Sequence, residues 1–204
     1  LGDSETGQKS KLALLDILLQ ASIDEDIRQE LNVFIFAGDD TTTSGLSHAL
    51  HVLSRYPEVQ DRVYKEILGV LGEDPDSPVT QSQLLDLKYL DCVIKETMRL
   101  HPPVPIIGRY IPNDLQIPGN TNIFLMPYYV LRDPEYFPDP QTFKPERWMD
   151  GENALLPNFA YIPFSAGPKN CMGQKFANLQ LKTLIRHFEL LILGKELKAI
   201  IHLY

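Results

Sequence analysis

The sequence predicts a mainly α-helical protein with a small β portion. Apolar residues recur at helical spacing before residue 100 and again after residue 173. Thirteen of the sixteen prolines lie between Pro102 and Pro168. Proline removes a backbone donor and breaks regular structure, so we expect an irregular middle section with short strands between two helical parts.

Composition and charge argue against several classes of protein. The net charge is -8 and no basic run is present, which disfavours nucleic-acid binding. No apolar run approaches the ~18–20 residues of a membrane span, and the first residues do not resemble a secretory leader. Two cysteines make a disulfide framework unexpected. Because the chain opens at Leu1 rather than at methionine, we expect a piece of a longer protein.

The first part of the chain is predicted to be helical. The run KLALLDILLQ has helical spacing, and Ser22 with Glu25 forms a capping box that starts a second helix. That helix meets no proline before Pro57, so a continuous helix of roughly 33 residues, about 50 Å long, is possible. Pro57 suits the first turn of a third helix.

Further caps place the next elements. Gly72 is expected to end the third helix, and Thr80 with Gln83 can cap a short one. The helix YLDCVIKETMRL should follow and end at HPP. The runs IIGRYI and NTNIFLM, separated by a proline-glycine turn, are predicted strands.

The section from residue 132 to Cys171 is predicted to be mostly looped, and the last helix is expected to begin after Gly173. Loops of this length are often functional. The last helix should bury one apolar stripe, which consists of Ala177, Leu181, Leu184, Ile185 and Phe188.

The loop FSAGPKNCMGQKFA carries the most specific chemistry. Glycines bracket Cys171, and the start of a helix, together with Lys169 and Lys175, favours negative charge at the sulfur. Such a cysteine can be a nucleophile, a redox sensor or a metal ligand, and a structural cysteine in a glycine-rich turn is the alternative. Zinc is disfavoured because there is no CxxC pair, and His48 and His51 suit a helix surface or core.

Phe164, Gly167, Lys169, Cys171 and Gly173 form the pattern F-x-x-G-x-[basic]-x-C-x-G. This pattern resembles the haem-ligating signature of cytochrome P450 monooxygenases. The resemblance implies that the loop binds haem b and that Cys171 is the axial thiolate ligand of its iron.

A Glu-x-x-Arg pair, Glu96 and Arg99, lies on the helix YLDCVIKETMRL. A helical wheel places both opposite the apolar stripe, which favours a solvated pair worth only ~0.2–0.5 kcal/mol. The family resemblance implies instead a buried structural triad with Arg147 of FKPERW. Loss of one partner would then be costly.

Arg109, a lone charge in an apolar strand, is expected from the residues alone to face outward. The resemblance implies that it reaches a haem propionate by charge-assisted bonds. Lys169 stands where the family usually has arginine. It can neutralise a propionate without two-pronged geometry, so weaker haem retention is expected.

The segment AGDDTT lies within the long predicted helix and resembles the oxygen-activation segment of the family. Ala37 and Gly38 would border the haem, with Gly38 letting the helix open. Thr41 would hydrogen-bond dioxygen or water there, and Asp40 would deliver protons to it. Asp39 is expected to face solvent. A capped turn between two helices is the alternative.

The resemblance covers nearly the whole chain and is greatest for the fatty-acid omega-hydroxylase branch and its insect relatives. Many members of that branch have a glutamate at the position of Ala37 that bonds covalently to haem, so no covalent attachment is expected here. Residues 1–204 are then one incomplete cytochrome P450 domain. Its N-terminal half, with the membrane anchor, and its extreme C-terminus are expected to be missing.

The resemblance implies insertion of one oxygen atom of dioxygen into a lipophilic substrate. Electrons would come from NADPH through a cytochrome reductase, with cytochrome b5 as a second donor, at the cytosolic face of the endoplasmic reticulum membrane. The alternatives are an inactive fragment of such an enzyme, isomerase or dehydratase chemistry on the same fold, and a helical interaction module with an inert Cys171.

Overall fold

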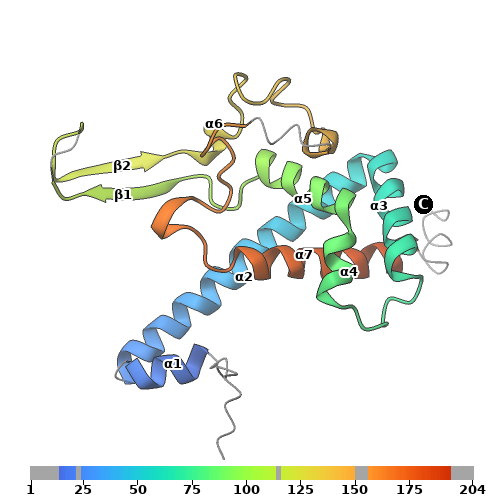
Figure 1. Ribbon diagram of the computed structural model, residues 1–204, viewed down its shortest axis with the longest axis horizontal. Helices are drawn as coiled ribbons and strands as arrows, with labels where there is room; N and C mark the ends of the chain where they lie inside the picture. The colour runs from blue at the N-terminus through green and yellow to red at the C-terminus, as the bar shows by residue number, and fades with distance from the viewer. Residues whose placement is uncertain (1–13, 22–23, 114–115, 150–155, 194–204) are drawn as a thin grey trace, which may run out of the picture. The chain divides into compact units, whose positions relative to one another are not determined.

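The computed structural model describes residues 14–21, 24–113, 116–149 and 156–193 (Figure 1). Within these ranges it is mainly helical with one two-stranded antiparallel sheet, which confirms the predicted fold class. The chain divides into two compact units, Leu1–Asp39 and Asp40–Tyr204. Among the described helices, none combines the length and the apolar run that a bilayer crossing requires.

The first unit contains α1 (Leu14–Ala21) and the first part of α2 (Asp24–Arg55). The expected cap residue Ser22 lies outside the described residues. Helix α2 continues without interruption through both aspartates, so the alternative of a capped turn between two helices is wrong. In this unit the side chain of Ile27 is buried, whereas Ile35 and Phe36 are exposed.

Capping residues define the next helices of the second unit much as predicted. Pro57 opens α3 (Pro57–Leu71), and Gly72 ends it with a φ of 81°. The Thr80 hydroxyl accepts a bond from the Gln83 amide at 3.3 Å, and the Gln83 side chain accepts one from the Thr80 amide at 2.9 Å. This capping box starts α4 (Gln81–Asp86), which is followed by α5 (Lys88–Leu100).

The core of the second unit joins the end of α2 to α3, α5 and α7 (Gln174–Leu193). Of the predicted stripe on α7, Leu181 and Ile185 are fully buried, whereas Phe188 is 36% exposed. The core residues from these helices are Ala49, Val52, Leu53, Val59, Val63, Ile67, Tyr89, Leu90, Val93, Ile94, Met98, Leu100, Leu181, Ile185 and Leu190.

Gly45 lets α2 approach its neighbours closely. A Cβ atom there would lie 2.8 Å from the Met98 Cε atom of α5 and 3.8 Å from Leu181 of α7. Gly38 differs, because within the described part of its own unit a Cβ atom there would meet no atom within 4 Å. Only one of these two helical glycines is therefore explained by packing.

Strands β1 (Ile107–Ile111) and β2 (Thr121–Leu125) form the predicted hairpin, visible side by side in Figure 1. Arg109 is paired with Ile123 and shares the half-buried face of β1 with its two isoleucines. In the described residues of the irregular section, α6 (Pro127–Val130) is followed by the short 3-10 helices η1 (Pro145–Trp148) and η3 (Gly167–Lys169).

Helix α7 also buries a polar stripe, which the sequence reasoning missed. The Lys182 ammonium is 3.0 Å from the Asp91 carboxylate and donates to the carbonyl oxygens of Leu84 and Leu87, both at 3.2 Å. Those carbonyls lie at the junction of α4 and α5. The Leu87 carbonyl also accepts the Asp91 amide at 3.3 Å, so the lysine adds a donor where one helix ends and the next begins.

One and two turns further on, Arg186 and Glu189 continue this stripe. The Arg186 guanidinium donates to the carbonyl oxygens of Asp74 and Pro75, which fixes the loop after α3. Glu189 is 1% exposed, and its Oε1 atom accepts a bond from the side-chain amide of Gln60 at 3.1 Å. Its Oε2 atom has no partner among the described residues. Burial raises the pKa of the Glu189 carboxyl, and the Gln60 bond opposes this effect.

We expect replacement of Gly45 by isoleucine to lower the free energy of unfolding by about 1–3 kcal/mol, because the added atoms overpack the contact with Met98. The control is Gly69→Ala in α3, where an added Cβ atom would meet no atom of another described segment within 4 Å. It should be neutral or stabilising by up to about 1 kcal/mol. Urea unfolding measures both, and equal effects would contradict the close approach at Gly45.

We expect Glu189→Gln to stabilise the chain at pH 7 by about 1 kcal/mol, because a buried, half-satisfied carboxylate is removed. A carboxyl with a raised folded pKa favours folding below that pKa, and the contribution is lost as pH rises through it. The advantage of the variant should therefore grow between pH 4 and pH 7. Urea unfolding at several pH values tests this, with exposed Glu58→Gln as the control. A pH-independent difference would contradict it.

Candidate functional site

The cysteine loop is closed by backbone hydrogen bonds. The amide of Cys171 donates to the Phe164 carbonyl at 2.9 Å, and the amide of Asn170 donates to the Gly167 carbonyl at 3.1 Å. Gly167 has a φ of 75°, which a side chain disfavours. The loop therefore holds an exposed, free cysteine on a defined backbone turn.

Gly173 stands next to the sulfur at the start of α7. A Cβ atom there would lie 3.8 Å from the Cys171 Sγ atom, and a longer side chain could extend over the thiol. The Gly173 carbonyl accepts the Ala177 amide at 2.8 Å, which begins the helix. The predicted glycine bracket thus leaves the sulfur accessible, since Cys171 is exposed.

Arg109 reaches the cysteine loop from strand β1. Its guanidinium donates to the Ser165 hydroxyl at 2.9 Å and to the Gly108 carbonyl at 2.8 Å. The expectation of an outward-facing arginine is therefore wrong, because the loop supplies a partner on the half-buried face. Lys169 and Lys175 are exposed on the same loop and the helix that follows. The neighbourhood of Cys171 is consequently positive.

The residues of AGDDTT lie on one continuous helix, across the boundary between the two units. Asp40 is exposed, Thr41 half-buried and Thr42 8% exposed in the second unit. Asp39 is exposed, as expected. Ala37 and Gly38 belong to the first unit, so their expected place beside a cofactor remains a prediction.

The other cysteine and the paired histidines have different surroundings. Cys92 is 6% exposed and burial raises the pKa of its thiol. The ring of His48 on α2 stacks on that of His101, with centroids 4.9 Å apart. Burial and the nearby His48 lower the pKa of His101. His48 therefore packs against a ring from the end of α5, in keeping with a structural role.

Glu96 of α5 is completely buried and receives five N–H bonds. Two come from the Arg99 guanidinium at 2.9 Å and one from Arg147 Nε at 3.0 Å. The Lys144 amide and the Trp148 indole donate the other two, at 3.0 and 2.8 Å. The structure thus brings Glu96, Arg99 and Arg147 together.

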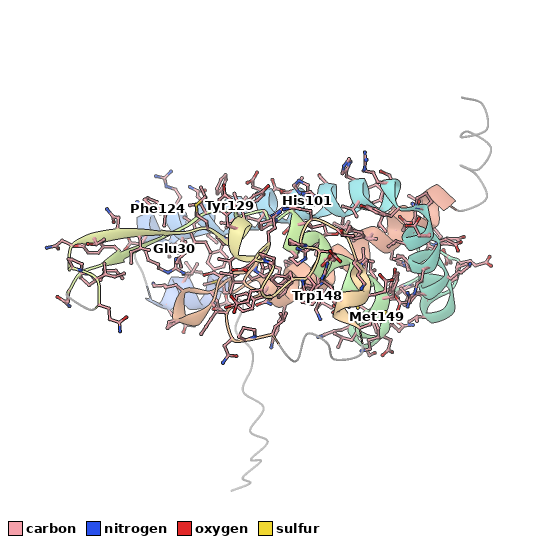
Figure 2. The ribbon with its side chains drawn as sticks, turned by 90° about the horizontal axis from the view of Figure 1, so that it is seen from above. Glu30, His101, Phe124, Tyr129, Trp148 and Met149 are labelled. Atoms are coloured by element: carbon pink, nitrogen blue, oxygen red, sulfur yellow. The ribbon has the colours of Figure 1, made fainter. Side chains whose placement is uncertain are left out.

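The helical wheel gave the wrong environment for this pair, because Glu96 and Arg99 are both 0% exposed. A helical wheel considers one helix alone. In the structure, the section after α6 covers the face of α5 that lies opposite the helical core. Trp148 was missed, although the only tryptophan in the chain directly follows Arg147. Figure 2 labels Trp148, whose indole lies against α5.

The two arginines also bind the proline-rich section through its carbonyl groups. Arg99 donates to the carbonyl oxygens of Leu131, Pro140 and Thr142, at 2.7–3.2 Å. Arg147 donates to that of Pro138 at 2.9 Å. Four of residues 132–148 are prolines without a backbone N–H group, and the backbone bonds within this section close only short turns. The guanidinium groups supply further donors to its carbonyl groups.

The fixed section is linked onward to the cysteine loop. The rings of Trp148 and Tyr161 lie 4.5 Å apart, and the Tyr161 hydroxyl donates to the Lys95 carbonyl at 3.1 Å. Burial raises the pKa of Tyr161 well above its usual range. Tyr161 precedes Phe164 by three residues. The segment that leads into the cysteine loop is therefore held against α5 by Tyr161.

The family model for cytochrome P450 matches residues 2–201. This chain belongs to the cytochrome P450 family.

The most informative relatives are proteins of Drosophila melanogaster. Probable cytochrome P450 4d21 is 67% identical over 98% of this chain and 42% of that protein. Probable cytochrome P450 4d20 is 57% identical over 99% of the chain and 42% of its own length. Cytochrome P450 4d8 is 43% identical over 98% of this chain and 47% of its own length. The chain thus spans less than half the length of these curated relatives.

We expect Glu96→Ala to lower the free energy of unfolding by about 3–5 kcal/mol, because two buried arginines lose their carboxylate. The matched control removes an acid from the exposed pair of Asp61 and Lys65 on α3. Asp61→Ala should cost no more than about 0.5 kcal/mol. Denaturant unfolding compares them, and similar losses would show that burial does not set the energy of the Glu96 cluster.

Proposed function

We propose that this chain is the haem-ligating and oxygen-activating part of a cytochrome P450 monooxygenase. The observation that carries the proposal is the free, exposed thiol of Cys171 on a closed loop beside Arg109. The family membership of residues 2–201 supports it independently. The whole enzyme would insert one atom of dioxygen into an organic substrate and reduce the other to water.

The donor chemistry of these residues fits haem. A thiolate is a suitable axial ligand for its iron, and the acidic propionates require cations. Cys171 supplies the sulfur, and Arg109 and Lys169 supply positive charge. Among the described residues, no carboxylate forms an ion pair with Arg109. Its charge is therefore available to an acidic ligand.

Phe164, Gly167 and Gly173 would shape the loop around the cofactor. The carbonyl of Phe164 and the turn at Gly167 hold the backbone on either side of the thiol. Gly173 keeps space beside the sulfur. Haem held by a thiolate supplies the iron chemistry that favours cleavage of the O–O bond. We expect no covalent attachment, because Ala37 offers no carboxylate.

Asp40 and Thr41 would perform the proton transfer. The exposed Asp40 carboxylate can exchange protons with solvent, and the Thr41 hydroxyl can both accept and donate a hydrogen bond. Neighbouring side chains on a helix point in different directions, so a proton would pass from one to the other by way of water. This pair favours monooxygenation over the isomerase or dehydratase alternative, which can dispense with it.

The likeness to the omega-hydroxylase branch and to the Drosophila relatives supports a small lipophilic substrate. NADPH would supply electrons through a cytochrome reductase, with cytochrome b5 as a second donor. The exposed Lys169 and Lys175 suit an acidic partner surface. The complete enzyme would act at the cytosolic face of the endoplasmic reticulum membrane.

We expect the haem-supplemented, reduced chain to give a carbon monoxide difference spectrum with a strongly red-shifted Soret band. Cys171→Ala should abolish this band, because it removes the thiolate ligand. Cys92→Ala is the matched control, since Cys92 is buried and separate from the loop, and it should keep the band. Absence of the band in the unmodified chain would favour the alternative of an inactive fragment. Persistence of the band in Cys171→Ala would refute the ligand assignment.

A further inference from the structure

Ser165 has a backbone conformation that serine disfavours. Its φ is 61°, in the left-handed region where glycine is the least strained residue. The Ser165 amide donates to the Ile162 carbonyl at 3.1 Å, which closes a turn directly before the Gly167 turn. A glycine would therefore suit the backbone better. The hydroxyl group is the feature of serine that offsets this cost.

That hydroxyl has a specific partner. The Ser165 Oγ atom accepts a bond from Arg109 Nη2 at 2.9 Å, across 56 residues of sequence. Arg109 Nη1 is held at 2.8 Å by the carbonyl of Gly108, on its own strand. The guanidinium is thus fixed at both terminal nitrogens, once by the hairpin and once by the cysteine loop.

An arginine has five N–H donors, of which these two bonds use two. Among the described residues, no ion pair occupies the rest. The Arg109 side chain is half-buried, so a ligand can reach it. A long side chain that is already held in place loses less conformational entropy when an anion binds.

We infer that Ser165 is a positioning residue, whose hydroxyl holds the Arg109 guanidinium beside the cysteine loop for an acidic group of the bound cofactor. This inference rests on the proposed haem binding for the identity of the ligand. The geometry itself does not depend on it: a serine in a glycine-like conformation is bonded to an arginine that forms no ion pair within the part of the chain the structure describes.

Ser165→Gly separates this role from a structural one. Glycine accepts the left-handed conformation, so the unfolding temperature should stay the same or rise. The rate of haem transfer from the loaded chain to apomyoglobin should nevertheless increase about fivefold. Ser165→Asn is the conservative variant, because asparagine tolerates the conformation and carries an acceptor oxygen, and it should restore slow transfer.

A double-mutant cycle with Arg109→Gln tests whether Ser165 acts through the arginine. In the Arg109→Gln background, Ser165→Gly should cause no further increase in haem transfer. The same fivefold increase in both backgrounds would overturn the inference. So would a transfer rate that Ser165→Gly leaves unchanged in the otherwise unmodified chain.

A haem-free measurement keeps the two proposals distinguishable. Nitrogen-15 relaxation of the Arg109 Nε–H group should show an ordered side chain, with order lost in Ser165→Gly and kept in Ser165→Asn. If the unmodified chain takes up no haem, the proposed function fails, and this measurement alone decides the role of Ser165. An Arg109 side chain equally ordered in all three proteins would overturn it.

Discussion

Five N–H groups converge on the Glu96 carboxylate, and three of them come from residues 144–148. The carboxylate is wholly removed from water, so its charge is tolerable only while all of these donors remain. The second unit depends on this constraint. It fixes the proline-rich section to α5, whereas the backbone bonds within that section close only short turns.

The same constraint extends to the chemistry. Trp148, held by Glu96, packs on Tyr161, and Tyr161 is bonded to the Lys95 carbonyl of α5. The chain enters the cysteine loop from this anchored residue. Arg109 meets the loop from the hairpin through Ser165. The position of the Cys171 thiol is therefore set from two directions by contacts that themselves take no part in a reaction.

Sequence patterns predicted the regular elements well, because caps and periodicity are local. The Thr80 box, the Pro57 start and the Gly72 stop each involve neighbours within one turn, and the structure has all of them. The prediction of a buried stripe on α7 was correct for Leu181 and Ile185 and wrong for Phe188, which is exposed. The polar stripe of Lys182, Arg186 and Glu189 escaped prediction, since charged residues on a helix are usually solvated.

The sequence by itself determined the class of fold, the helix and strand positions, and the family resemblance carried by the cysteine loop. Those features depend on neighbours in the chain or on a pattern of ten residues. Only the tertiary structure decided that Glu96 and Arg99 are buried, that Trp148 completes their cluster and that Ser165 holds Arg109. The residues joined by these bonds lie 3 to 56 positions apart in the sequence. The pattern of one helix or strand cannot show which of its faces is buried, because burial depends on the other segments that cover that face.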